Sequence, residues 1–458
     1  MRKRLSQLLA AIACSGVAAI AQTTTTPMPT SIEGWADRAA RFGKAIPQEQ
    51  IFVHMDNNCY FLGDTIYYKA YVQRSDTRKP SGVSGVLYAD LYNQDGYLVE
   101  RQQVELRNGQ AHGSFLLPDS LYSGYYELRA YTRWMLNWGI TDHPHTKMAE
   151  QWFITRSYAR DYYIDYEKLY SRTFPVYDKP KQEGTFEHNM TLRPLRKRIR
   201  SNGTDPDLEL AVYPEGGNLV AGLPCRVAWE GNTDEGLHKD GTLVVTDQNG
   251  QQVATSKTES RGRGTFSFTP QQGMTYTAQF TAGNQTAKVK LPKAQSDGCA
   301  IQVEQDGNKV SISLACAGLA AQEPLGVTVM CQGVQQGFVQ TEAGKGQTID
   351  MDAQTLRTGV NQVTVFDAKG RIWADRLFFV RNGQTLSFSG LSKKETDPYA
   401  PVKVEIKGGV PGSSLSVAVR DAAHTEYLYD NNNIMTEMLL SSQVKGFVEN
   451  PTYFFEKD

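Results

Sequence analysis

The 458-residue sequence has almost no net charge and few cysteines, and both scarcities exclude classes of protein. Lys and Arg total 48 against 49 Asp and Glu, so the overall charge favours neither nucleic acid nor an anionic membrane as a partner. The six cysteines never occur as C-x-x-C, the spacing of zinc and redox sites. Hydrophobic residues make up 40% of the chain, which is enough for several cores. A chain of this length holds about two to four domains.

Sequence signatures of catalysis are also missing. There is no G-x-S-x-G nucleophile elbow and no G-x-x-x-x-G-K-[ST] phosphate-binding loop. The histidines offer two loose groups, which are Asp142 with His143 and His145, and Asp421 with His424 and Glu426. Pro144 and the lack of a clear third ligand favour a surface loop for the first group, and a loop at a strand end is the better interpretation of the second. We therefore expect no enzyme activity, no catalytic, cofactor-binding or metal-binding residues, and no cofactor.

The N-terminus has the three parts of a secretory signal peptide. A basic start at residues 2–4 precedes a mostly apolar stretch at residues 8–20, and Ala19-Ile20-Ala21 supplies small residues for cleavage. We predict a signal peptide over residues 1–21, with lipid attachment at Cys14 as the alternative. No later stretch reaches the ~18 apolar residues of a membrane helix. The mature chain is therefore expected to be exported and to have no transmembrane helix.

From residue 51 onward, short segments carry apolar side chains at every second position. One face of residues 65–72 holds Ile66, Tyr68, Ala70 and Val72, and one face of residues 86–92 holds Leu87, Ala89 and Leu91. Similar runs recur to the end of the chain, separated by turn sequences such as Asp95-Gly96. Short strands with turns about every 8–12 residues are typical of sandwiches and barrels. The predicted fold class is all-β, with tandem immunoglobulin-like antiparallel β-sandwich domains.

Two parts of the sequence repeat one six-point pattern. Gly113-Ser114-Phe115, Pro118, Gly124 and Tyr126 recur as Gly264-Thr265-Phe266, Pro270, Gly273 and Tyr276. The Phe would fill a core, the Pro would end a strand, and the Gly would permit the turn before the strand that carries the Tyr. The repeat predicts the same sandwich built twice.

These patterns divide the chain into a series of segments. After the signal peptide we expect a linker with a short helix (22–50, helix Ile32–Phe42), a sandwich (51–157), a basic linker (158–205), two sandwiches (206–293 and 294–384), and a partial sandwich with a helical or irregular C-terminal segment (385–458). The last block rests on Val402, Val404 and Ile406, followed by Leu415, Val417 and Val419.

The basic linker carries a cluster of cationic side chains, which are Arg193, Arg196, Lys197, Arg198 and Arg200. Its composition favours a solvated connection between domains. A segment that proteases cleave or that a partner binds is the alternative, because exposed Arg and Lys residues on a loose backbone favour cleavage.

The sequence on either side of Gly307-Asn308 is typical of a hairpin. If these two residues form the turn, Cys299 lies directly opposite Cys316, but a register change of one residue removes this pairing. Sequence alone does not fix cysteine connectivity. A Cys299–Cys316 disulfide and a set of single buried thiols therefore both stay open.

Tyrosines and a phenylalanine gather in the first predicted sandwich, at Tyr60, Phe61, Tyr67, Tyr68, Tyr71, Tyr122, Tyr125 and Tyr126. They would suit a ligand platform, because Tyr combines apolar area with a polar tip. Alternating Tyr residues on a strand more commonly cover one sheet face, and we favour that interpretation.

Several segments resemble the second macroglobulin domain (MG2) of alpha-2-macroglobulin-like proteins, and in particular long exported proteins of Bacteroidetes-type bacteria. These segments are residues 51–56, 63–71, 117–121, 128–132, 213–220, 366–367 and 376–380. The resemblance covers most of residues 51–455 and implies tandem macroglobulin-type β-sandwiches in the cell envelope, in the periplasm or at the outer-membrane surface.

Two departures limit what the resemblance implies. Thioester macroglobulins trap proteases through a Cys-Gly-Glu-Gln segment, and this sequence has none, because Cys299 is followed by Ala300-Ile301-Gln302. Proteins of the resembling group also run on well beyond a segment like residues 439–451, often into a region that resembles the plug of TonB-dependent outer-membrane receptors. We expect the present chain to be truncated before such a region.

The sequence thus favours a binding or scaffold protein of the envelope. The resemblance implies protein partners, either a protease or an outer-membrane receptor complex. The alternatives are a non-covalent endopeptidase inhibitor that uses residues 193–200 as bait, and a glycan-binding or carbohydrate-active protein, for which no motif is present.

Overall fold

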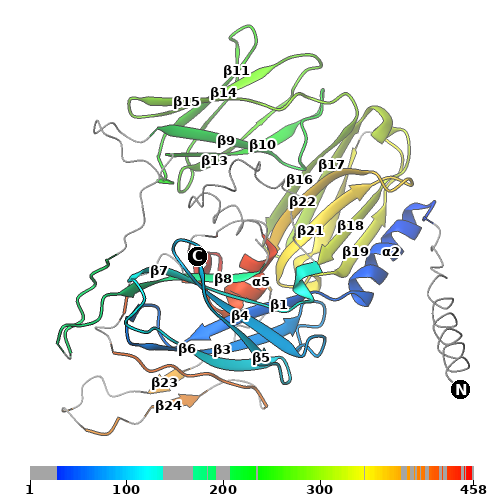
Figure 1. Cartoon of the computed structure of the whole chain (residues 1–458). Coiled ribbons are helices and arrows are strands. Elements are labelled where there is room, and N and C mark those ends of the chain that lie inside the picture. Colours follow the sequence, from blue (N-terminus) through cyan, green and yellow to red (C-terminus); the bar gives the residue numbers. More distant parts are fainter. Residues whose placement is uncertain are drawn as a thin grey trace, which may run out of the picture.

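A computed structural model describes residues 28–137, 169–182, 184–191, 207–233, 236–344, 346–382, 389–391, 397, 400–402, 404–407, 412–421, 425–426, 431–444, 448 and 450–455. The predicted signal peptide, the Asp142–His145 group, the cationic residues 193–200 and His424 lie outside these residues. Most of the described chain forms antiparallel sheets, and these pack into three sandwiches (Figure 1).

The first sandwich follows helix α2 (Ile32–Ala45). One of its sheets has the order β1-β3-β6, and the other has the order β2-β8-β7-β4-β5. The strands are β1 (Glu49–Met55), β2 (Tyr60–Phe61), β3 (Thr65–Arg74), β4 (Val86–Asn93), β5 (Leu98–Glu105), β6 (Gln110–Leu116), β7 (Gly124–Tyr131) and β8 (Tyr170–Tyr177). Among the described strands, only the short β2 runs parallel to its neighbour, β8.

The second sandwich pairs the sheets β13-β10-β9 and β12-β11-β14-β15. Its strands are β9 (Leu208–Pro214), β10 (Cys225–Thr233), β11 (Thr242–Asp247), β12 (Gln252–Lys257), β13 (Arg263–Phe268), β14 (Tyr276–Ala282) and β15 (Gln285–Lys290). The third pairs β16-β17-β20 with β19-β18-β21-β22. Its strands are β16 (Gly298–Asp306), β17 (Lys309–Ala317), β18 (Gly326–Cys331), β19 (Val334–Gln340), β20 (Gly346–Asp352), β21 (Gly359–Phe366) and β22 (Ile372–Val380).

All three sandwiches share one topology. Apart from the added β2, the first, second and fifth strands form one sheet, and the fourth, third, sixth and seventh form the other, in that spatial order. The predicted fold class, all-β with tandem immunoglobulin-like antiparallel sandwiches, is confirmed. In each unit the first strand ends one sheet and the seventh lies at or next to the end of the other. We call the space between these two strands the edge seam.

The predicted alternation places the cores. Ile66, Tyr68, Ala70 and Val72 are all buried in the first sandwich, together with Leu87, Ala89 and Leu91 of β4. Because successive side chains of a strand point to opposite faces, one apolar set on each sheet is enough to fill the space between two sheets.

The internal repeat has the expected structural meaning. Phe115 and Phe266 both lie on the fifth strand of their sandwiches, and both are buried. Tyr126 and Tyr276 lie on the sixth strands. The Tyr126 hydroxyl donates to the carbonyl of Tyr122 (2.6 Å), and the Tyr276 hydroxyl accepts from the N–H of Gln271 (2.8 Å). Each Tyr therefore ties its strand to the turn before it.

The last predicted block differs from expectation, because its described residues do not form a sandwich. β23 (Ser389–Leu391) and β24 (Glu405–Lys407) form a two-stranded ladder, drawn in orange in Figure 1. Residues 412–421 are described and belong to no strand. Val417 and Val419, which the alternation assigned to a core, are 64% and 92% exposed. Alternation shows which side chains share a face, but a core also needs a second layer over that face.

Helical elements are short and lie at the ends of the described chain and in its connections. The helix expected over Ile32–Phe42 is present as α2, which begins after the N-cap Ser31. The C-terminal segment contains α5 (Ile434–Leu439), followed by the 3₁₀ turns η5 (Ser441–Gln443) and η6 (Pro451–Phe455). The other 3₁₀ turns among the described residues are η1 (Met135–Asn137), η2 (Gly318–Ala321) and η3 (Ala353–Thr355).

Candidate functional site

The second and third sandwiches meet at the turn after β9, and Glu215 lies at the centre of their contact. Its side chain is 6% exposed. The carboxylate accepts hydrogen bonds from Arg226 of the second sandwich (3.0 Å) and from Arg376 of the third (3.0 Å). It also accepts one from the backbone N–H of Val303 in β16, at 3.1 Å. One buried carboxylate thus joins two sandwiches through charge-assisted hydrogen bonds.

The Glu215 contact predicts a pH-dependent stability. Burial alone would raise the pKa of Glu215, but the hydrogen bonds from Arg226, the Val303 N–H and Arg376 lower that pKa below its ordinary 4.5. Because the folded pKa is the lower one, the contact contributes fully above about pH 4.5 and its contribution is lost as the pH falls further.

We expect Glu215→Gln to lower the free energy of unfolding by about 1.5–3 kcal/mol at about pH 7, because a neutral amide replaces the shared charge. At about pH 3 the difference should be smaller than at about pH 7, because the contribution of the ionised carboxylate falls as the pH drops below about 4.5. Urea unfolding of both proteins at both pH values measures this. An equal difference at the two pH values would contradict the ionic role of Glu215.

Helix α5 completes the first sandwich from the far end of the chain. The Asn433 side chain accepts hydrogen bonds from the N–H groups of Met435 (2.9 Å) and Thr436 (3.2 Å). In return, the Thr436 hydroxyl accepts from the Asn433 N–H (2.8 Å). This reciprocal cap stabilises a helix of only six residues. The helix places the Met438 side chain in the core of the first sandwich.

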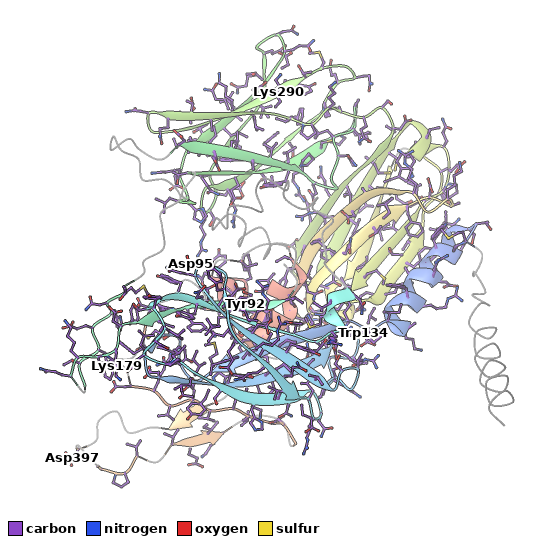
Figure 2. All side chains as sticks on the ribbon, viewed as in Figure 1. Tyr92, Asp95, Trp134, Lys179, Lys290 and Asp397 are labelled. Carbon is purple, nitrogen blue, oxygen red and sulfur yellow. The ribbon has the colours of Figure 1, made fainter. Side chains whose placement is uncertain are left out.

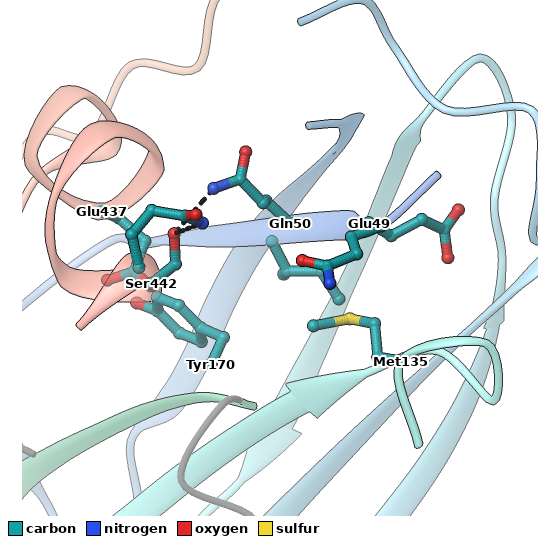
Figure 3. A pocket seen from close by; sticks show the side chains of 9 residues that line it. Glu49, Gln50, Met135, Tyr170, Glu437 and Ser442 are labelled. Atoms are coloured by element: carbon teal, nitrogen blue, oxygen red, sulfur yellow. Dashed lines mark hydrogen bonds between the residues drawn. The ribbon is translucent and has the colours of Figure 1, made fainter. Parts of the chain in front are cut away.

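The backbone carbonyl of Met438 also connects the first sandwich to the third. It accepts hydrogen bonds from Gln50 of β1 (2.9 Å) and from Gln332, in the turn after β18 (2.8 Å). Gln50 donates to the hydroxyl of Ser442 as well, at 2.8 Å, as the dashed lines in Figure 3 mark. Both glutamines are buried. α5 is therefore a joint that two sandwiches share.

A small cavity remains beneath this joint. It has about 30 Å³ and is lined by residues 48–51, Met135, Tyr170, Glu437, Ser442 and Gln443 (Figure 3). This volume holds about two water molecules and is far below the ~300–1,000 Å³ of typical ligand pockets. We therefore assign a structural role to this place.

The first and third sandwiches each contribute one arginine that donates hydrogen bonds to the other sandwich. Arg78, in the turn after β3, donates to the side chain of Gln332 (3.0 Å) and to the carbonyl of Thr358 in the third sandwich. Arg357 of the third sandwich donates to the carbonyl of Asp76 in the first, at 2.8 Å. Each guanidinium satisfies carbonyl groups of the other sandwich, which is how buried polar groups at an interface are usually paired.

Helix α2 packs on the third sandwich, although it precedes the first in the sequence. Ile32 and Ala36 are buried against Phe366. The Trp35 indole donates to the carbonyl of Ala368 at 3.1 Å. The Trp134 indole of the first sandwich, labelled near α2 in Figure 2, donates to the carbonyl of Pro47, in the connection between α2 and β1, at 2.7 Å.

Glu426, a member of the second histidine group of the sequence, is placed at one end of the first sandwich. The side-chain amide of Asn58 makes two hydrogen bonds to the backbone of Glu426. It donates to the Glu426 carbonyl (2.5 Å) and accepts from the Glu426 N–H (3.2 Å). The Glu426 carboxylate accepts from the Tyr177 hydroxyl and lies 3.0 Å from Nδ1 of His188. Burial, together with Glu426, raises the pKa of Tyr177. This arrangement anchors the C-terminal segment.

The segment 412–421 contacts the outer side of the β1-β3-β6 sheet through two serines. Lys69 donates to Ser414 (2.7 Å). Ser416 bonds with Nδ1 of His54 (2.6 Å) and accepts from the Tyr71 hydroxyl (2.9 Å). Its small polar side chains thus face the sheet, and its valines face solvent.

The aromatic group of the first sandwich is divided between two environments. Tyr60, Phe61, Tyr68 and Tyr126 are buried, whereas Tyr67, Tyr122 and Tyr125 are exposed and Tyr71 is partly buried. The buried members serve the core, so the structure does not assemble the eight side chains into one ligand platform.

Cys299 and Cys316 lie in the register that the predicted turn requires. Residues 306 and 309 flank the Gly307-Asn308 turn, and the two cysteines are direct cross-strand partners with their sulfurs 3.1 Å apart. All five described cysteines are buried thiols. A hydrogen bond to Cys316, together with burial, raises the pKa of Cys299.

We expect none of the five thiols to react with a thiol reagent while the protein is folded, because all five are buried and inaccessible to the reagent. In denaturant, protein that has been exported to an oxidising compartment should show two fewer reactive thiols than protein made under reducing conditions. Titration of thiols with and without prior reduction measures the difference. An equal count in both would leave Cys299 and Cys316 as single thiols.

Neither a metal site nor a membrane helix is found in the described part of the chain. No three His, Cys, Asp or Glu side chains there gather closely enough to hold a metal ion. None of the described helices is both long and apolar enough to span a bilayer.

Sequence reasoning missed the residues that make the joints, namely Gln50, Arg78, Glu215, Gln332, Arg357 and Met438. A weak signal existed for Glu215, since an acidic residue between Pro214 and Gly216-Gly217 directly follows a strand.

Solved structures that resemble the chain include bacterial macroglobulins and adhesion proteins. Escherichia coli alpha-2-macroglobulin activated by porcine elastase is 13% identical with a TM-score of 0.25, over 79% of this chain and 33% of that one. Salmonella alpha-2-macroglobulin reacted with methylamine is 12% identical with a TM-score of 0.20, over 79% and 25%. A tetra-tandem repeat from the extending region of a large adhesion protein is 12% identical with a TM-score of 0.19, over 79% and 88%.

The chain spans about a quarter to a third of the length of these macroglobulins. No protein-family model and no curated protein sequence matches it. Such low identities and TM-scores assign neither a family nor an activity to the chain.

Proposed function

We propose that this chain is an exported scaffold of the cell envelope that binds other proteins and holds them in a fixed arrangement. The observation that carries the proposal is the buried Glu215 contact, in which one carboxylate is shared by two sandwiches. Domains in one chain move relative to one another unless their interface prevents it. Separation would remove the Arg376 and Val303 partners of this buried carboxylate and leave only Arg226, so the contact disfavours such motion.

The α5 joint supports the same proposal. It ties the first sandwich to the third through the Met438 carbonyl, so the three sandwiches form a connected body. Rigid scaffolds present binding groups on loops and strand edges. The partner class that the sequence resemblance implies is an outer-membrane transport complex of the TonB-dependent type, and the predicted signal peptide would deliver the chain to that compartment.

A pull-down with the mature chain, residues 22–458, tests this function. Immobilised protein is exposed to envelope extracts of the producing cells, and Gly216→Val, which disturbs the joint between the second and third sandwiches, serves as the matched variant. We expect the wild type to recover an outer-membrane receptor or transport subunit, and the variant to recover less of it. Recovery of no protein, together with glycan binding on an array, would contradict the proposal. Loss of activity of a recovered protease would favour the inhibitor instead.

A further inference from the structure

Strand β16 contributes to the cores of two sandwiches at once. It is the first strand of the third sandwich and lies where that sandwich meets the second (Figure 1). Cys299 and Ile301 are buried in the core of the third sandwich, whereas Ala300, between them, belongs to the core of the second. Successive side chains of a strand point to opposite faces, so one strand can supply both cores. The second sandwich can therefore move away from the third only by losing its contact with β16.

The chain just before β16 and the strand itself are also bonded to the second sandwich through the backbone. The N–H of Gln295 donates to the carbonyl of Leu219, and the carbonyl of Gln295 accepts from the N–H of Ala221, both at 2.9 Å. Farther along, the N–H of Val303 donates to the Glu215 carboxylate at 3.1 Å. The second sandwich therefore holds this part of the chain at two places.

Within its own sandwich, β16 is held by a ladder on one side. It ends the sheet β16-β17-β20, so β17 is its only ladder partner among the described strands. Its other side lies at the edge seam with β22, on which the turn that carries Gly216 packs. An edge strand opens more easily than a central one, because half of its backbone groups lack a ladder bond. The joint between the second and third sandwiches therefore depends on the pairing of β16 with β17.

Cys299 and Cys316 lie in this pairing. They are direct cross-strand partners, their sulfurs are 3.1 Å apart, and both side chains are buried in the core of the third sandwich. A disulfide requires facing Cβ atoms on neighbouring backbones, and directly opposed residues of an antiparallel pair provide them. The two thiols are therefore placed to link β16 covalently to β17.

We propose that Cys299 and Cys316 form a disulfide that fixes β16 to the third sandwich, so that the joint between the second and third sandwiches depends on redox conditions. The bond forms by exchange with a disulfide donor, which is a protein dithiol oxidoreductase or a small molecule such as oxidised glutathione. One cysteine thiolate attacks a donor sulfur and releases one donor thiolate, and the other then attacks the mixed disulfide and releases the second. The cysteine pair loses two electrons and two protons, and the donor gains them as two thiols.

The exchange takes place during folding, because both sulfurs are buried once the two sheets have closed. The bond links residues 17 apart in the sequence, and a cross-link of this size restricts the open strand much more than the paired one. The oxidised joint should therefore open less than the reduced joint. This inference deepens the proposed function and rests on it for its biological meaning, since a scaffold in an oxidising compartment would become stiff there.

Hydrogen exchange followed by mass spectrometry tests the inference on two preparations of the mature chain. One is exported to an oxidising compartment, and the other is made under reducing conditions. The double variant Cys299→Ala/Cys316→Ala, made in both ways, is the matched control, because it lacks the disulfide but keeps every other difference between the preparations. Cys225→Ala is a second control, because this buried sulfur bonds to the backbone of Val220 and Leu223 in the second sandwich.

We expect the β16 amides of the oxidised wild type to exchange at least about tenfold more slowly than those of the reduced wild type. Peptide mapping of the exported protein should recover Cys299 linked to Cys316. The double variant should exchange equally in both preparations, and Cys225→Ala should keep the difference seen in the wild type. Absence of the linked peptides, equal exchange in the two wild-type preparations, or a difference that persists in the double variant would overturn the inference. None of these readouts uses a partner protein, so a failed pull-down would remove the scaffold function and leave this result standing.

Discussion

Gly216→Val is expected to separate the second sandwich from the third. Gly216 has a φ of +83°, and a Cβ added there would lie 2.5 Å from Cγ2 of Ile301 and 3.4 Å from Cβ of Ala374. The left-handed conformation costs a residue with a side chain about 1–2 kcal/mol. Overpacking adds about 1–3 kcal/mol. The joint should therefore lose several kcal/mol, and the distribution of distances between spin labels on the two sandwiches should broaden.

Gly217→Ala is the matched control for this prediction. Gly217 has a φ of +90°, but a Cβ there would meet no atom within 4 Å. The control therefore includes the conformational cost without the collision with the third sandwich. Its distance distribution should stay close to that of the wild type. Equal broadening in both variants would show that the backbone conformation of the turn holds the joint, and not its packing on Ile301.

Met438→Ala is expected to destabilise the first sandwich, although Met438 is far from the strands of that sandwich in sequence. Met438 is buried in a core built from residues 51–176, and its truncation leaves a cavity there. Substitutions of this kind cost about 2–5 kcal/mol. Hydrogen exchange of β1 amides, followed by mass spectrometry, should show faster exchange in the variant, because β1 lies directly under α5.

Ile434→Ala provides the control on the same helix. Ile434 is the first residue of α5 and is 44% exposed, so its truncation removes little buried area. Both substitutions change the helix propensity of α5 by small amounts compared with the loss of a core side chain. If Ile434→Ala accelerated exchange in β1 as much as Met438→Ala does, core filling by Met438 would not explain the effect.

Features that depend on neighbouring residues could be predicted from the sequence. The faces of β3 and β4 follow from alternation, which is a property of the strand itself. The pairing of Cys299 with Cys316 follows from a two-residue turn, because a hairpin register is set by its loop. The repeated pattern around Phe115 and Phe266 predicted two related sandwiches for the same reason, since each copy contains its own strand, turn and Tyr.

The joints could not be predicted, because their partners are far apart in the chain. Glu215 is bonded to Arg376, 161 residues away, and no local pattern marks either residue as the partner of the other. A buried acid is rare enough that sequence reasoning places Glu on the surface by default.

The C-terminal block shows the opposite failure. Its alternation is as regular as that of β3, yet Val417 and Val419 face solvent. Alternation depends on the strand, whereas burial depends on whether another layer covers it, and the second condition is not encoded locally.

The position of α5 has a consequence for the order in which the molecule folds. The contact between Gln50 and Met438 spans 388 residues, so a chain that is synthesised from its N-terminus must hold an incomplete first core until nearly all of it has been made. The entropy of closing so long a loop rises only slowly with length, so the final state is not penalised much. The long separation instead slows the folding of the first sandwich, because contacts of high sequence separation form late. The N-terminal unit is then the last of the three to be completed, and the place of the Met438 side chain in its core stays empty until then.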